Sequence, residues 1–387
     1  MDWKDYISKI KSCAERNIYI YGAGRIGIKL YEKLKTEGIR VKAFLVTDAS
    51  MNRRENSGVP IIQFDRISDL PENVLILIGI KKPWNNEIIK TLNDAGLNNY
   101  LDVIESVERL SEKPILFEIT TCIGCSVACK YCPQKILTRK YQGNRMLQFE
   151  SFKLAIDKVP KDRMIAFSGF SEPFLNPNCA DMICYAHELG HPIMLATTLV
   201  GMTMHDFEKI KHIPFHIFTL HLPDKVGNAN IPMTDEYFEL LDAVLDARKI
   251  VDGKEQPLIG KANCQGEIHP LIKKRVAGRT MIFAELADRA GNLEPDNIIH
   301  SIGTLSGCIY CNYSPSLDNN VMLPNGDVVL CCMDFGMRHI LGNIFTQSFE
   351  EIRTSPNLQM VRNGLVHSEG ADVLCRHCSE AKEYAKS

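Results

Sequence analysis

The chain of 387 residues lacks a marked excess of either charge, an apolar leader and any long apolar run. Its 45 lysines and arginines face 47 aspartates and glutamates, which leaves a formal net charge of −2 and no general attraction to nucleic acid or to anionic membranes. Residues 1–11 are charged and contain no apolar core of signal-peptide length. No stretch approaches the roughly 20 apolar residues of a membrane span. We therefore expect a cytoplasmic protein without nucleic-acid or membrane partners.

The sequence also lacks internal repeats and low-complexity tracts, and its pattern changes twice along the chain. Residues 1–111 alternate β-rich runs with helical patterns around a glycine turn, which predicts a Rossmann-like parallel sheet. Residues 112–300 continue this α/β alternation, which predicts a parallel barrel or part of one. Residues 301–387 are too few for a large core and predict a small α+β domain held by metal. Strands are expected at 17–21, 41–46, 74–79, 116–120, 164–167, 193–197, 216–220 and 280–283, and helices at 85–95, 149–159 and 179–188.

Cysteine, by contrast, is abundant, with 14 residues. Disulfides are not expected in a reducing compartment, so metal or redox use is the favoured interpretation. Four cysteines are scattered, as buried core cysteines would be. The other ten fall into two clusters, Cys122, Cys125, Cys129 and Cys132, and then Cys308, Cys311, Cys331, Cys332, Cys375 and Cys378.

The first cluster contains the spacing Cys-x3-Cys-x2-Cys at Cys125, Cys129 and Cys132. Three thiolates on one tight loop can hold three irons of a cubane and leave the fourth iron open to a chelating molecule. A structural zinc site prefers four closed ligands. Cys122 would supply the fourth ligand of such a site, so zinc stays open as the alternative.

The spacing resembles the signature of the radical S-adenosylmethionine (SAM) superfamily. The resemblance implies a partial (β/α)6 barrel and a [4Fe-4S] cluster whose open iron is chelated by SAM. It also implies that one electron, from a donor such as flavodoxin or ferredoxin, cleaves SAM to methionine and a 5′-deoxyadenosyl radical. That radical takes a hydrogen atom from substrate. Tyr131 stands where the family has an aromatic residue that contacts the adenine.

Two later segments resemble further SAM-contacting segments of this family. The turn Gly169-Phe-Ser171-Glu172-Pro is similar to the Gly-Glu-Pro segment that binds the SAM amino group, with Ser171 in place of the usual glycine. Small residues there let backbone carbonyls approach an ammonium. Thr197 and Thr198 are similar to the ribose-binding segment, with Thr198 where the family has asparagine.

Arg289 begins an Arg-Ala-Gly-Asn segment that also occurs in relatives of this family. Its guanidinium is suited to pair with a carboxylate of SAM or of substrate. A solvated arginine before a turn is the other interpretation, and both stay open.

The second cluster resembles the SPASM/twitch extension of radical SAM enzymes. The matching motifs are Gly326-x4-Cys331, a Leu-Gly-Asn turn at 341–343, and Cys375-x2-Cys378. The resemblance implies a second, auxiliary [4Fe-4S] cluster held by four thiolates, and Cys378, the last cysteine, leaves room for one such cluster only. The expected ligands are Cys311, Cys331, Cys375 and Cys378, with Cys308 as the rival to Cys311. A zinc ribbon built from the two Cys-x2-Cys pairs is the alternative.

A glycine loop, Gly22-x-Gly24-x2-Gly27, follows the first strand and opens a helix, and Asp48 lies about 20 residues on. This context is that of a dinucleotide fingerprint, which would place NAD(P) or a nucleotide phosphate at the helix N-terminus. The other interpretation is that the loop only packs the helix on the strand. The region looks like nucleotide-binding-like domains of sugar-modifying enzymes, which often bind no dinucleotide.

These features predict a radical SAM oxidoreductase that abstracts hydrogen from a substrate carbon and passes an electron to the auxiliary cluster. A sugar, a nucleotide-linked sugar or another small glycan-type molecule is the favoured substrate. The alternatives are a radical epimerase, for which Cys264 is the tentative thiol donor if it is not simply a small buried residue, and a peptide-modifying enzyme. An alternative of another class is a non-catalytic iron-sulfur or zinc protein.

Overall fold

The computed structural model describes residues 3–12, 16–47, 55–56, 58–64, 73–80, 84–103, 115–251, 253–280, 282–283, 289–290, 292, 304–366 and 372–383. The chain divides into two compact units, residues 1–113 with 385–387 and residues 114–384. The boundaries expected after residues 111 and 300 lie within 104–114 and 293–303, outside the described residues. The second unit contains both the expected barrel region and the cysteine-rich C-terminal segment.

The first unit holds one sheet in the order β3-β4-β2-β1-β5-β6, in which only β3 runs antiparallel to its neighbour. The three strands expected here are confirmed, and three short strands at the sheet edges were not foreseen. The strands are β1 (Asn17–Tyr21), β2 (Val41–Val46), β3 (Glu55–Asn56), β4 (Val59–Gln63), β5 (Val74–Ile78) and β6 (Tyr100–Asp102).

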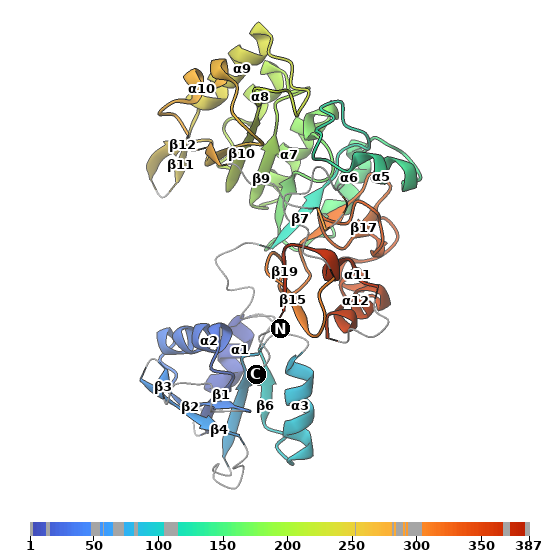
Figure 1. The fold of residues 1–387 in the computed structure, drawn as a ribbon. Helices are drawn as coiled ribbons and strands as arrows, with labels where there is room; N and C mark the ends of the chain where they lie inside the picture. The colour runs from blue at the N-terminus through green and yellow to red at the C-terminus, as the bar shows by residue number, and fades with distance from the viewer. Residues whose placement is uncertain are drawn as a thin grey trace. The chain divides into compact units, whose positions relative to one another are not determined.

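Helices cover both faces of this sheet (Figure 1). Helices α1 (Trp3–Lys11) and α2 (Arg25–Thr36) pack on the face that carries Ile20, whereas α3 (Trp84–Asp94) packs on the face that carries Tyr19. Because neighbouring strand residues point to opposite faces, a strand buried on both sides reads as a continuous apolar run.

The second unit is organised around a nine-stranded sheet in the order β14-β13-β10-β9-β8-β7-β16-β17-β18. Its first six members follow chain order and run parallel. The cysteine-rich segment adds the other three, and β16 pairs in parallel with β7. The strands are β7 (Leu116–Ile119), β8 (Met164–Phe167), β9 (Ile193–Thr197), β10 (Ile217–Leu222), β13 (Lys261–Cys264), β14 (Ile282–Phe283), β16 (Asn320–Met322), β17 (Asp327–Val329) and β18 (Ile340–Asn343).

Helices and short hairpins connect these strands, so the unit is a mixed α/β structure with a parallel sheet, as expected. The helices are α5 (Gln134–Lys140), α6 (Phe149–Ile156), α7 (Cys179–Glu188), α8 (Met204–Ile210), α9 (Asp235–Asp246), α10 (Pro270–Val276), α11 (Phe349–Arg353) and α12 (Pro356–Val366), with short 3-10 turns η2 (Pro173–Leu175) and η4 (Leu374–His377). Two hairpins are formed by β11 (Arg248–Val251) with β12 (Lys254–Pro257), and by β15 (Ile309–Cys311) with β19 (Ala381–Glu383).

The parallel strands of the second unit have two chemically different faces. The outer face, with residues such as Phe167, Leu195 and Phe218, packs on the helices in the main apolar core. The opposite, inner face carries a small apolar cluster at the beginning of the strands, which includes Leu116 and Met164. Because residues two apart along a strand share a face, the polar residues next along β7, β10 and β13 belong to the inner face, namely Glu118, Thr219, His221 and Asn263.

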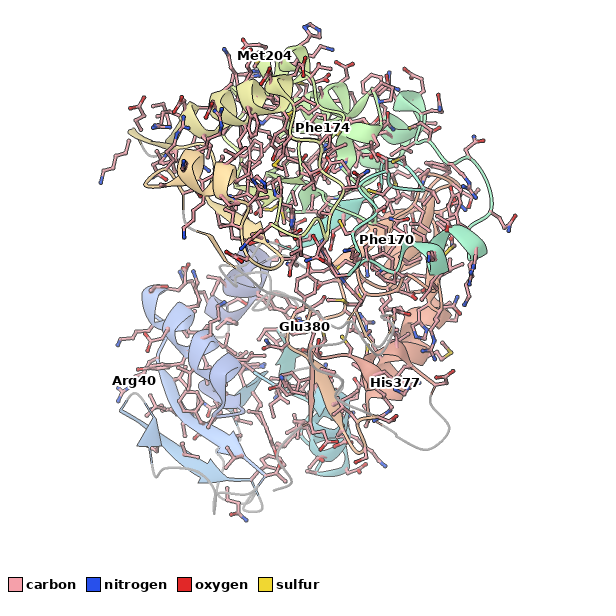
Figure 2. The ribbon with its side chains drawn as sticks, turned by 45° about the horizontal axis from the view of Figure 1, so that its top comes forward. Arg40, Phe170, Phe174, Met204, His377 and Glu380 are labelled. Carbon is pink, nitrogen blue, oxygen red and sulfur yellow. The ribbon has the colours of Figure 1, made fainter. Side chains whose placement is uncertain are left out.

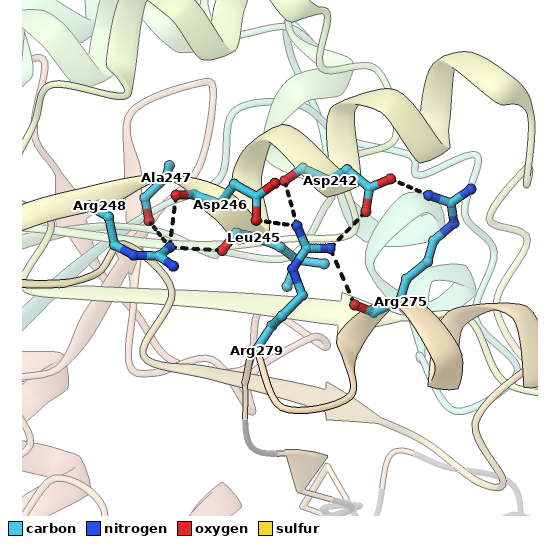
Figure 3. A network of polar contacts seen from close by, with 7 residues as sticks. All are labelled: Asp242, Leu245, Asp246, Ala247, Arg248, Arg275 and Arg279. Carbon is cyan, nitrogen blue, oxygen red and sulfur yellow. Dashed lines mark hydrogen bonds and ion pairs between the residues drawn. The ribbon is translucent and has the colours of Figure 1, made fainter.

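An ion-pair network joins α9 to the chain around α10 (Figure 3). Asp242 accepts a 2.8 Å hydrogen bond from Arg279 and a second hydrogen bond from Arg275. Arg279 also pairs with Asp246. The network fixes the α10 end of the sheet, next to the strands β13 and β14.

In the described parts of the chain, no helix is both long enough and apolar enough to cross a bilayer.

Candidate metal centres and cofactor site

The first cysteine loop follows β7 directly and uses two residues in the left-handed region, Gly124 (φ 94°) and Ala128 (φ 43°). Cys125, Cys129 and Cys132 are all half-buried. Burial and, to a smaller extent, the thiolates of Cys129 and Cys125 raise the pKa of Cys132 to about 12, although Arg289 lowers it. The three cysteines therefore influence one another within one short loop, and a loop with three thiols fits three corners of a cubane cluster.

Cys122, which precedes this trio, is buried. Its thiol is 3.5 Å from the hydroxyl of Ser171 and 3.6 Å from the carbonyl of Gly124. Burial is the main cause that raises the pKa of Cys122. The structure thus gives Cys122 partners of its own in the turn after β8, which favours the three-ligand interpretation of the loop.

Tyr131 is held beside the same loop. Its hydroxyl forms a hydrogen bond with Cys129, and burial together with the Cys129 thiolate raises the pKa of Tyr131. Tyr131 therefore lies beside Cys129, and its contact with an adenine stays a prediction.

Glu172 connects the two segments that were expected to contact SAM. Its carboxylate accepts hydrogen bonds from the hydroxyl of Thr197 at 2.6 Å, from the amide and hydroxyl of Thr198 at 2.7 Å each, and from the amide of Phe174 at 3.3 Å. Both carboxylate oxygens are occupied in this way. We conclude that Glu172 positions the two segments against each other, which leaves the backbone of the turn to meet a cofactor.

Gly169 is required by the close approach of that turn to β7. A Cβ atom at Gly169 would lie 2.6 Å from both the carbonyl oxygen of Ile119 and the hydroxyl of Thr120. The amide of Phe170 donates to the same hydroxyl at 3.1 Å. Figure 2 labels Phe170 and Phe174, which flank the turn on either side of Ser171 and Glu172.

Arg289 turns toward the first cysteine loop. It is half-buried with φ 54°, and its guanidinium carbon lies 6.0 Å from the ring centre of Phe335. Its charge lowers the pKa of Cys132 and of Glu118. Arg289 is therefore not a fully solvated arginine, and a carboxylate of SAM or of substrate as its partner stays a prediction.

The four cysteines expected as auxiliary ligands line one apolar pocket. Cys311, Cys331, Cys375 and Cys378 surround it together with Leu317, Leu330 and Met333, whereas Cys308 is not among its lining residues. Burial raises the pKa of Cys375, and Cys311 and Cys378 raise it further. The amide of Ser314 donates to the Cys311 sulfur at 3.2 Å. Four thiols in an apolar enclosure, with a backbone donor to sulfur, fit a cluster with four thiolate ligands.

Buried polar contacts fix the loop that carries Cys375 and Cys378. Arg376, which is 3% exposed, donates hydrogen bonds to the carbonyls of Leu305, Gly307 and Gly364. The amide of Leu374 donates to Nε2 of His339 at 3.0 Å. Within the described residues no three metal-ligating side chains meet at a point that would hold a single ion. Cys311, Cys331, Cys375 and Cys378 surround the apolar pocket instead.

Cys332 points away from this pocket, as expected for the neighbour of Cys331. It forms hydrogen bonds with Glu118 and Tyr313. Sequence reasoning did not single out these two residues. The available signal was the lone acidic residue in the otherwise apolar strand Leu116–Ile119.

Cys264 lies on the outer face of β13. It is 2% exposed within the main apolar core, and its thiol is 3.7 Å from the carbonyl of Pro223. The structure therefore does not bring Cys264 to the inner face, where its neighbour Asn263 lies, and its position is that of a packed core residue.

The glycine loop of the first unit is explained in large part by packing. A Cβ atom at Gly27 would lie 1.8 Å from the carbonyl oxygen of Gly22, and one at Gly22 would lie 2.9 Å from that of Gly79. Gly24 has open space around it. Asp48 lies outside the described residues, so nucleotide binding by this loop stays a prediction.

Comparison with known families identifies one part of the chain. Residues 311–379 match the model of SPASM, an iron-sulfur cluster-binding domain. The C-terminal segment is therefore similar to SPASM domains, and we call it the SPASM domain here. The matched range of this domain begins at Cys311 and contains all four cysteines of the apolar pocket, but not Cys308. The prediction of an iron-sulfur cluster-binding domain at this end of the chain is confirmed.

Similar solved structures include BtrN in complex with AdoMet and 2-DOIA, which is 15% identical with a TM-score of 0.45 over 71% of this chain and 95% of that chain. Streptococcus suis SuiB bound to S-adenosylmethionine is 13% identical with a TM-score of 0.44, over 77% and 81%. The protein anSMEcpe with bound AdoMet and a Cp18Cys peptide is 14% identical with a TM-score of 0.42, over 69% and 86%. No curated protein matches the sequence.

Proposed function

We propose that the chain is a radical SAM oxidoreductase whose SPASM domain holds the auxiliary cluster. The observation that carries the proposal is that both cysteine-bearing segments are attached to the same sheet. The loop with Cys125, Cys129 and Cys132 leaves β7, and β7 pairs directly with β16 of the SPASM domain. Cys331 follows β17, which pairs with β16, whereas Cys311 belongs to the β15–β19 hairpin. Two iron-sulfur sites in one compact unit suit a reaction in which an electron passes between them.

The first site is assigned a [4Fe-4S] cluster that, with SAM bound, supplies a 5′-deoxyadenosyl radical. The six parallel strands from β7 to β14 are interpreted as the partial (β/α)6 barrel around it. Tyr131, Gly169, Ser171, Thr197 and Thr198 would hold SAM, and Glu172 keeps their segments together.

The second site is assigned a further [4Fe-4S] cluster, held by Cys311, Cys331, Cys375 and Cys378. A cluster with four thiolates and no open iron is suited to take up an electron from the substrate. A substrate alcohol is then oxidised to a ketone. The favoured substrate is a sugar or a nucleotide-linked sugar, and a flavodoxin or ferredoxin is the expected electron donor to the first site.

The experiment that tests this proposal is SAM cleavage. Anaerobically reconstituted protein is reduced with dithionite, and 5′-deoxyadenosine and methionine are quantified. We expect cleavage by the wild-type protein and none by Cys129→Ala. Intact SAM after reduction of fully reconstituted wild-type protein would contradict the proposal and favour a non-catalytic iron-sulfur protein.

A second function, radical epimerisation, is favoured by the position of one thiol. Cys332 makes hydrogen bonds with Glu118 and Tyr313, and Glu118 belongs to the inner face. An epimerase needs a thiol that returns a hydrogen atom to the opposite side of the substrate carbon. Cys332 meets that need better than the core residue Cys264.

A further inference from the structure

Glu118 lies at the joint between the two metal-binding parts of the second unit. It is the third residue of β7, which lies between β8 and β16 in the sheet. Its neighbours Phe117 and Ile119 belong to the outer apolar core, so Glu118 belongs to the inner face. The side chain is 4% exposed. A carboxyl group at such a place is costly to bury, and its position in the fold therefore needs a reason.

The carboxylate is hydrogen-bonded from both sides of this joint. Ser168, which follows β8, donates to Oε2 at 2.8 Å. Tyr313 of the SPASM domain donates to Oε1 at 3.2 Å, and Cys332 supplies a third hydrogen bond. An ionised carboxylate has about four lone-pair sites. One acceptor site therefore stays open.

The inner face that carries Glu118 also carries groups that can donate hydrogen bonds to a ligand. The side chains of Ser168, His221 and Arg289 are half-buried, so each is partly exposed. In the described part of the molecule, Nε of Arg289 and the hydroxyl of Thr219 on the inner face are buried without hydrogen-bond partners. Buried polar atoms of this kind are usually satisfied by water or by a ligand. A ligand with several hydroxyl groups could donate to the open acceptor site of Glu118 and accept from these unpaired polar atoms, because each hydroxyl both donates and accepts.

Glu118 is also connected to both metal-binding sites through its neighbours. Tyr313 donates to Glu118 and lines the four-cysteine pocket of the SPASM domain. Arg289 acts electrostatically on Glu118 and on Cys132 of the first loop. A molecule hydrogen-bonded to Glu118 would thus be connected through Tyr313 to the four-cysteine pocket and through Arg289 to Cys132 of the first loop.

We propose that Glu118 binds a hydroxyl group of a polyhydroxylated substrate and takes up its proton while the carbon that bears it is oxidised. The inference rests on the proposed function and assigns a residue and a substrate class to it. The hydroxyl proton leaves to the Glu118 carboxylate, and the C–O bond becomes C=O. SAM at the first site would supply the 5′-deoxyadenosyl radical that takes the C–H hydrogen atom and becomes 5′-deoxyadenosine, and a cluster held by the four-cysteine pocket would supply the acceptor for the one remaining electron.

The electrostatic setting agrees with this role. Burial raises the pKa of Glu118 above its usual value, and hydrogen bonds from Ser168, Tyr313 and Cys332 as well as the charge of Arg289 lower it in part. The carboxylate is therefore a better proton acceptor than an exposed one. A carboxylate in place of the hydroxyl group would be repelled by the Glu118 carboxylate.

The first test is binding, which needs no turnover. Reconstituted, unreduced protein with SAM is titrated calorimetrically with glucose, and with succinate as the anionic comparison. We expect glucose to bind and Glu118→Gln to weaken binding by at least roughly tenfold, as expected for a lost hydrogen bond to a charged group. Ser168→Ala is a second variant with a smaller change. Glu267→Gln, at a site that is 71% exposed, is the matched control and should bind like wild type. Iron content and circular dichroism establish that each variant is folded.

The second test follows hydrogen transfer. Reduced wild-type protein with perdeuterated glucose should form deuterated 5′-deoxyadenosine and an oxidised sugar, whereas Glu118→Gln should form no oxidised sugar. Equal glucose binding and oxidation by wild type and folded Glu118→Gln would overturn the role of Glu118. Succinate binding without glucose binding, or no glucose binding at all, would overturn the substrate class. Failure of wild-type protein to cleave SAM would refute the proposed function instead, and the calorimetric comparison would still decide whether Glu118 binds the sugar.

Discussion

The hydroxyl of Thr197 donates a 2.6 Å hydrogen bond to the carboxylate of Glu172. This bond joins the end of β9 to the turn that follows β8, two segments that the sequence places 25 positions apart. Because the carboxylate also accepts from Thr198, the spatial relation of the two proposed SAM-contacting segments depends on this one side chain.

The first prediction concerns this carboxylate. Glu172→Gln replaces one acceptor oxygen by an amide group that faces donors, so we expect a loss of about 1–3 kcal/mol in unfolding free energy. We also expect weaker SAM binding, because the two segments are no longer held together. Urea unfolding and equilibrium dialysis with SAM measure the two effects. Glu208→Gln, at an exposed site of α8, is the control, and equal SAM affinity of both variants would contradict a positioning role.

The second prediction concerns the ligands of the SPASM site. Wild-type protein should hold about eight irons in two four-iron clusters. Cys375→Ser should lose about half of them, since Cys375 lines the pocket, whereas Cys308→Ser should keep them all. Iron and sulfide analysis after anaerobic reconstitution checks this. Cys375→Ser should also retain uncoupled SAM cleavage but form no product. Loss of iron in Cys308→Ser, or zinc at this site in wild type, would show that the ligand assignment is wrong.

The third prediction separates oxidation from epimerisation. In heavy water, oxidation gives a product two mass units lighter than the substrate, without deuterium at carbon. Epimerisation gives a product with one deuterium at carbon. If epimerisation is observed, Cys332→Ala should abolish it, because Cys332 contacts inner-face residue Glu118. Cys264→Ala should leave it nearly unchanged, because Cys264 is packed in the outer core. Mass spectrometry of the product, together with the two alanine variants, makes the decision.

The fourth prediction concerns the pH dependence of stability. Burial, together with the charges of Arg289 and Lys261, lowers the pKa of His221 to about 4. Between pH 6.5, the ordinary value of a histidine, and this lowered value, the unfolded chain binds a proton that the folded protein does not. His221 therefore does not reduce the free energy of unfolding above about pH 6.5, and this free energy decreases as the pH falls from there toward 4. Urea unfolding of His221→Gln should show a smaller loss over this range than wild type, and an identical pH profile would refute the assignment.

The strands could be predicted where an apolar run marks them. Residues 164–167 and 193–197 were placed correctly because each run is buried and bounded by turns. The strand at 261–264 was missed, because Lys261 and Asn263 make half of it polar. Its strand character comes from pairing with β10, which no local pattern reveals.

The cysteine sites could be predicted because their spacing is local within each motif. The contact between Tyr313 and Glu118 could not, because 195 positions separate the two residues. The same holds for the role of Glu172, which sequence reasoning assigned to the cofactor. The carboxylate is instead occupied by threonines that approach it only in the folded sheet.

The pairing of β16 with β7 has a consequence for the synthesis of the protein. The amide of Leu116, at the start of β7, donates to the side chain of Asn319, 203 positions later. Until that later segment has left the ribosome, one edge of β7 lacks its partner strand, and an open strand edge is prone to pair with other chains. The loop with Cys125, Cys129 and Cys132 therefore obtains its final support only after β16 has been synthesised. Insertion of the first iron-sulfur cluster into a stable site is expected to await this later strand.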